Sequence, residues 1–110
     1  MKVIYNKYLP LKDYVAINLF GIIFARKEFK PISRVTENHE RIHTVQMREL
    51  LFIFFYLWYM IEWIVRLIQY RNSKEAYLNI SFEREAHKNQ SDLGYLKVRK
   101  HYQNLKYLSI

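Results

Sequence analysis

The sequence predicts a mainly α-helical protein of the α+β class, with a short β hairpin or strand near its N-terminus. Residues 37–71 contain no glycine and no proline, the usual helix breakers, and the whole chain of 110 residues has only two of each. Residues 14–25, in contrast, are rich in β-branched and aromatic side chains on both sides of Gly21. The length indicates a single small domain over residues 1–110, with one modest core.

Composition excludes several classes of protein. A hydrophobic content of 51% and an aromatic content of 17% indicate a folded domain rather than a disordered chain. There is no cysteine, which excludes a disulfide framework and cysteine-ligated zinc. The net charge of +8 favours an anionic neighbour, such as a membrane surface, nucleic acid or an acidic protein. The first residues lack the apolar region and cleavage site of a secretory signal, so we expect no cleavable signal peptide.

The N-terminal third is predicted to be extended. Residues 1–13 mix lysine, tyrosine and leucine around Pro10, and we expect a loose or short extended lead-in. Residues 14–20 and 22–25 are predicted to form two short strands, or one bent strand, against the following helix. A buried helical segment stays open as an alternative, because short apolar runs do not distinguish strand from helix.

A long helix is predicted next. Pro31 and Ser33 are start signals, and Thr36 is the expected N-cap. Residues 50–68 are apolar apart from Glu62 and Arg66, and they would span about 28 Å as a helix. Two interpretations stay open: a helix in contact with a membrane, or the central helix of a small domain that is covered on all sides. The remaining sequence offers few apolar elements to cover this helix, which favours membrane contact or a homo-oligomer.

Shorter elements are predicted to follow the long helix. Residues 75–80 are expected to form a short helical turn, and residues 81–90 a helix with Ser81 as its cap. Residues 92–110 are basic, with regularly spaced tyrosine and leucine, and we expect a peripheral helix or arm.

The predicted long helix contains the pattern H-E-x-x-H, as His39-Glu40-Arg41-Ile42-His43. Residues four apart lie on one face of a helix, so His39 and His43 can direct two imidazoles at one ion. Zn²⁺ accepts such nitrogens and usually takes a third protein ligand plus a water. Glu40 lies at the rim of that face, where its carboxylate can accept a proton from the zinc-activated water. The simpler interpretation is a surface helix with two solvated histidines.

The motif, together with Glu83-x-x-Ala86 on the later helix, resembles the gluzincin metallopeptidases. It is similar in particular to their membrane-associated branches, such as the HtpX-like one, and the chain has the length of the minigluzincins. The resemblance covers about residues 20–95. It implies a zinc-dependent hydrolase in which His39, His43 and Glu83 bind Zn²⁺, Glu40 is the general base, and a peptide or protein is the substrate. Many relatives have an aspartate after the alanine, where this chain has His87.

Other residues stay open as members of the site. Glu83 shares a helix face with Ala86 and His87, whereas Glu85 points away from that face. The alternatives for the third ligand are Glu85, His87 and Glu75. Weaker candidates for an active-site role are four further polar residues and one imidazole: Tyr95, Tyr102, Gln46, Glu49 and His101.

The sequence therefore predicts a zinc metallopeptidase, either membrane-associated through residues 50–68 or cytoplasmic. One alternative is a latent or inactive metal-binding relative, which the missing aspartate favours. Another is a non-enzymatic basic module at a membrane. A nucleic-acid partner is not favoured, because lysine and arginine are scattered along the chain and no recognition motif is present.

Overall fold

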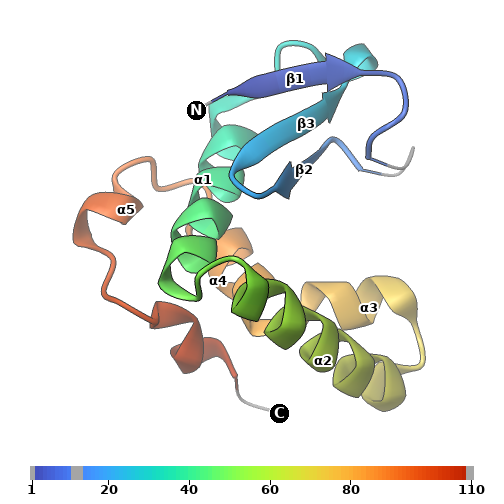
Figure 1. Ribbon diagram of the computed structural model, residues 1–110, viewed down its shortest axis with the longest axis vertical. Coiled ribbons are helices and arrows are strands. Elements are labelled where there is room, and N and C mark those ends of the chain that lie inside the picture. Colours follow the sequence, from blue (N-terminus) through green and yellow to red (C-terminus); the bar gives the residue numbers. More distant parts are fainter. Residues whose placement is uncertain (1, 11–13, 109–110) are drawn as a thin grey trace.

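A small β-sheet lies at one end of a group of helices in the computed structural model, which describes residues 2–10 and 14–108 (Figure 1). The strands are β1 (Val3–Asn6), β2 (Ala16–Leu19) and β3 (Ile22–Arg26). Their order is β1-β3-β2, with β1 parallel and β2 antiparallel to β3. The predicted hairpin is thus β2–β3, and the expected extended lead-in contains β1. Parts of that lead-in, residue 1 and residues 11–13, lie outside the described residues.

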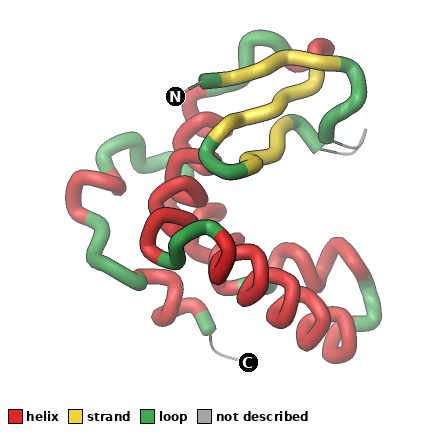
Figure 2. Tube along the Cα trace, in the orientation of Figure 1, coloured by secondary structure: helices red, strands yellow, loops and turns green. Residues whose placement is uncertain are grey.

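The helices account for most of the chain, as Figure 2 shows, so the predicted fold class is confirmed. Two longer helices, two shorter ones and a single turn follow the sheet: α1 (Arg34–Glu49), α2 (Ile53–Tyr70), α3 (Ser73–Leu78), α4 (Ser81–Asn89) and α5 (Tyr95–Val98). Two 3₁₀ segments complete the described chain: η1 (Lys27–Phe29) and η2 (Gln103–Tyr107).

The caps of two helices differ from the prediction. Ser33, and not Thr36, is the N-cap of α1, since its side chain accepts a hydrogen bond from the Thr36 backbone N–H at 3.0 Å. Ile80, and not Ser81, is the N-cap of α4. The Ser81 hydroxyl instead donates to the buried carboxylate of Glu62, which also accepts the Ser81 N–H at 2.9 Å. Because α2 packs against the start of α4, the Ser81 hydroxyl binds Glu62 and does not cap α4.

The predicted long helix is interrupted between α1 and α2. Leu51 and Phe52 have φ angles of 54° and 62°, and the axes of the two helices meet at 111°. A residue other than glycine with a positive φ angle costs roughly 1–3 kcal/mol. The bend returns α2 over α4, where it completes an apolar cluster of Met47, Phe55, Ile80 and Phe82. Tertiary packing thus overrides the local preference for a continuous helix.

Within the described chain, no single helix is both long enough and apolar enough to cross a membrane. The helices α1 and α2 together satisfy the criteria of length and composition, but only as a sharply bent pair. Nor is α2 a central helix covered on all sides: Phe55, Glu62 and Arg66 are buried, whereas its outward apolar side chains are exposed.

Replacing Glu62 with alanine is expected to lower the free energy of unfolding by about 1–3 kcal/mol, because it leaves the buried Ser81 N–H without its acceptor. Urea denaturation followed by circular dichroism measures this change. Lys97→Ala, at an exposed position on α5, is the control and should stay within about 0.5 kcal/mol of the parent protein. Equal effects of the two substitutions would contradict a structural role for Glu62.

Candidate metal centre

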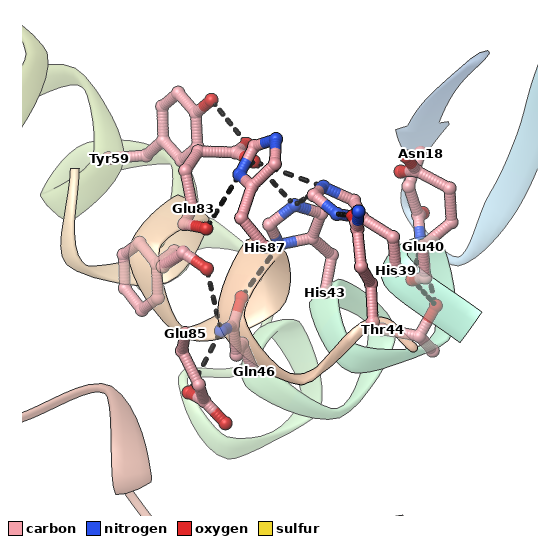
Figure 3. Close-up of polar contacts among 12 residues, drawn as sticks. Asn18, His39, Glu40, His43, Thr44, Gln46, Tyr59, Glu83, Glu85 and His87 are labelled. Carbon is pink, nitrogen blue, oxygen red and sulfur yellow. Dashed lines mark hydrogen bonds and ion pairs between the residues drawn. The ribbon is translucent and has the colours of Figure 1, made fainter. Parts of the chain in front are cut away.

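The contact between α1 and α4 brings His39, His43 and Glu83 together (Figure 3). The Nε2 atoms of both histidines lie 3.1 Å from the same carboxylate oxygen, Oε1 of Glu83. These two Nε2 atoms also lie 3.1 Å from each other. All three side chains are buried. The structure therefore brings together the two histidines of the sequence motif and the carboxylate that we expected from the later helix.

The dimensions of this triangle suit a zinc ion. Bonds of about 2.0–2.1 Å in a tetrahedral arrangement separate the ligand atoms by about 3.3–3.4 Å. The three observed separations of 3.1 Å are close to that value, so a small outward movement of the side chains would admit the ion.

The outer nitrogen of each imidazole is held by an amide oxygen. His39 Nδ1 donates to Gln90 Oε1 at 2.8 Å, and His43 Nδ1 donates to Gln46 Oε1 at 2.7 Å. The orientation of the Gln46 amide is fixed, because its Nε2 donates to the Phe82 carbonyl and to the Glu85 carboxylate. With a proton on each Nδ1 atom, the Nε2 atoms are left to share a cation with Glu83, which is a proton in the metal-free centre and would be the metal ion when one is bound. Three acceptors thus converge in a buried space, and this arrangement requires a positive charge between them.

Glu83 is held from its other side by α2. Tyr59 donates its hydroxyl to Glu83 Oε2 at 2.7 Å, which leaves Oε1 directed at the two imidazoles. Burial favours a raised pKa for Glu83, but the charge on His43 and hydrogen bonds from both histidines hold that pKa well below its usual value. Burial similarly disfavours a charged His43, yet the Glu83 carboxylate raises the pKa of His43 to about 9. Glu83 is therefore ionised, and the centre attracts a cation, whether a proton or a metal ion.

His87 lies beside this centre. Its Nδ1 atom donates to the backbone carbonyl of Glu83 at 2.8 Å and lies 3.8 Å from Glu83 Oε1. The candidate ligand atoms of His39, Glu83 and His87 all lie within 4.8 Å of one another, so these residues form a second set that could hold a metal. The set that contains His43 is the more compact of the two, and His43 is more deeply buried than His87.

Glu40 lines a pocket next to the metal centre. The pocket has a volume of about 360 Å³, and His43 and Glu83 also line it. Burial raises the pKa of the Glu40 carboxyl to about 8; the charge of His43 opposes this shift and that of Glu83 adds to it. In the part of the chain that the structure describes, no hydrogen bond or ion pair is found for this carboxylate. It is therefore available to a group that enters the pocket.

The edge strand β2 forms one wall of the pocket. Asn18 ties this strand to α1, because its amide donates to the Glu40 carbonyl at 2.7 Å and to the Thr44 hydroxyl at 2.6 Å. The other walls are largely aromatic and apolar, and include Tyr56 and Tyr77. The pocket therefore joins a polar end, at the metal centre, to an apolar body.

The remaining candidates lie outside the ligand set. Glu85 was an alternative third ligand, but it faces away and binds Arg99 and the Tyr95 hydroxyl, the latter at 2.7 Å. Glu75 is exposed on α3. Three of the weaker candidates, Glu49, His101 and Tyr102, contact one another away from the centre. The Glu49 carboxylate pairs with His101 and with Arg99, and it accepts a hydrogen bond from the Tyr102 backbone N–H. Gln46 does belong to the centre, because its side-chain oxygen accepts the hydrogen bond from His43.

Two further residues at the centre were not predicted. Gln90 lies seven residues after Glu83, on the same face of the helix, and this spacing is a signal that could have found it. Tyr59 gave no comparable signal, because the chain has ten tyrosines and its contact depends on the bend between α1 and α2.

Comparison with protein-family models, with curated protein sequences and with solved structures found no match to this chain. The resemblance to the gluzincins therefore rests on the residues of the sequence motif alone and stays an expectation.

Substitution of Gln90 by leucine is expected to weaken Zn²⁺ binding by about 10–100-fold, because His39 loses the acceptor that orients its ring. Competition with a chromophoric chelator measures the dissociation constant. Gln90→Glu keeps an acceptor and should retain most of the affinity, and Gln103→Leu makes the same change in η2 as a control. Equal affinity in Gln90→Leu and the parent protein would show that Gln90 has no role in orienting His39.

Proposed function

We propose that the protein is a zinc-dependent metallopeptidase, a hydrolase that cleaves peptide bonds in a peptide or protein substrate. His39, His43 and Glu83 would bind Zn²⁺, and Glu40 would be the general base. The observation that carries this proposal is the convergence of three buried acceptor atoms, each 3.1 Å from the other two. A surface helix with two solvated histidines would not bury both rings or fix both outer nitrogens.

The chemistry divides between the ion and Glu40. When bound, zinc polarises a substrate carbonyl and lowers the pKa of water toward about 7. Glu40 accepts a proton from the water whose oxygen attacks the carbonyl carbon. As the C–N bond breaks, Glu40 returns that proton to the leaving nitrogen. Burial raises the pKa of Glu40 in the metal-free protein, and the charge of a bound zinc ion would lower it, so that the carboxylate could accept the proton.

The sheet supports the choice of an extended peptide as substrate. β2 is an edge strand, so one side of its backbone has no strand partner in the described sheet. An extended chain that paired with β2 would lie along the wall of the pocket that Glu40 lines. The apolar body of the pocket would accept a large apolar side chain of that peptide.

A latent or inactive metal-binding relative is the second candidate. The observation that favours it is His87 at the position where related enzymes are expected to have aspartate. One observation speaks against it. The Gln90 amide oxygen, on the same helix face, accepts a hydrogen bond from His39 and so can orient the ring as an aspartate would. In a non-enzymatic basic module, the same cluster would be a buried ion pair between protonated His43 and Glu83.

Membrane association also remains part of the proposal, as the alternative to a cytoplasmic location. The exposed apolar side of α2 supports it, and the same surface is the one through which a homo-oligomer would form.

Glu40→Gln is expected to keep the zinc content of the parent protein and to lower peptidase turnover by about 10²–10⁴-fold, because the amide cannot accept the proton. Hydrolysis of a pool of quenched fluorescent peptides measures turnover. The control is Glu37→Gln, a matched substitution at a partly exposed position on α1, which should leave turnover unchanged. Undiminished turnover in Glu40→Gln would overturn the assignment of the base. A zinc-loaded parent protein that cleaves no peptide would favour the latent relative.

A further inference from the structure

The side of α2 that faces away from α4 is an uninterrupted apolar surface, here called the outer face of α2. Its side chains are 42–72% exposed. They recur every three or four residues, so they lie along one side of the helix. The outer face consists of Ile53, Phe54, Leu57, Met60, Ile61, Ile64, Val65 and Ile68.

The charges of α2 are turned away from this surface. Glu62 and Arg66 are the charged residues of the helix, and both are buried on the side of the protein interior. Glu62 binds the start of α4, and Arg66 donates to the Leu108 carbonyl at 3.1 Å. The outer face therefore presents no charge from Ile53 to Ile68, or over about 24 Å of helix. A continuous exposed surface of this kind indicates a partner, because solvated helices ordinarily carry polar side chains outward.

Cationic side chains lie at both ends of the outer face. Arg48, at the end of α1, precedes it, whereas Arg71 and Lys74 follow it, and all three are exposed. Glu75 on α3 offsets one of these charges. An apolar surface with basic residues at its ends is typical of helices that lie in the interface of an anionic bilayer, where lysine and arginine face lipid phosphate and carboxylate groups.

Charge also distinguishes a bilayer from a second copy of the chain. Each copy carries a net charge of +8, so two copies repel each other, whereas an anionic membrane attracts each of them. We propose that the outer face of α2 docks onto an anionic lipid bilayer, with the helix lying in the plane of the membrane. This inference is independent of the proposed peptidase activity.

The apolar surface continues from α2 toward the candidate site. Phe20, at the turn between β2 and β3, is 64% exposed and packs against Tyr56 and Phe52, with ring centroids 5.0 and 6.4 Å away. Tyr56 also lines the pocket that contains Glu40. Docking through the outer face would therefore hold the candidate site beside the bilayer.

Co-sedimentation of the full chain with lipid vesicles tests the proposal. We expect binding to vesicles of phosphatidylcholine that contain about one-third phosphatidylserine, and weaker binding to pure phosphatidylcholine or at high salt. Leu57→Glu and Ile64→Glu should each weaken binding by at least about tenfold, because each removes an apolar side chain that the bilayer would bury and adds a negative charge. Val98→Glu, the same kind of change at an exposed position on α5, is the control and should bind as the parent protein does.

Circular dichroism shows whether the variants fold, and both substituted side chains are exposed, so we expect unchanged spectra. Failure of the parent protein to bind the anionic vesicles would overturn the proposal, as would equal binding by folded Leu57→Glu. Sedimentation equilibrium gives the other outcome: a dimer that Leu57→Glu dissociates, without vesicle binding, would identify a second copy as the occupant of the outer face.

Discussion

The contact of one carboxylate oxygen with two imidazole nitrogens is the interaction on which the rest of the structure depends. Glu83 Oε1 joins α4 to α1 at His39 and His43, within a buried space that cannot hold three acceptors without a positive charge. Ala86 and Ile42 are fully buried and pack together in the same interface. The small side chain of Ala86 allows the two helices to approach closely enough for the contact to form.

Successive polar contacts connect this centre to the C-terminal segment. The Gln46 amide that orients His43 is held by the buried carboxylate of Glu85. Glu85 in turn binds the Arg99 guanidinium, and Arg99 also pairs with Glu49 at 3.0 Å. The segment that sequence patterning predicts as a peripheral arm therefore anchors the residues that orient the candidate metal centre.

The parts of the fold that local periodicity determines could be predicted from the sequence. One turn of helix is enough to place His39 and His43 on the same side, and the periodicity of α4 is enough to show which face carries Glu83. The bend at Leu51 could not be predicted, because no glycine or proline marks it and packing against α4 imposes it. The contact of Tyr59 with Glu83 depends on that bend and was missed for the same reason. The cap of α1 is Ser33, and the prediction of Thr36 missed it because local sequence signals fix the ends of a helix only to within a few residues.

Metal analysis of the protein purified without added zinc tests the central claim most directly. The parent protein is expected to retain about one zinc ion per chain after dialysis against a weak chelator. His43→Ala removes one of the three converging atoms and Glu83→Gln removes the negative charge of the centre, so both should retain almost no zinc, whereas Gln103→Leu should match the parent. A parent protein that retains no transition metal, or a His43→Ala variant with the same zinc content, would contradict the account.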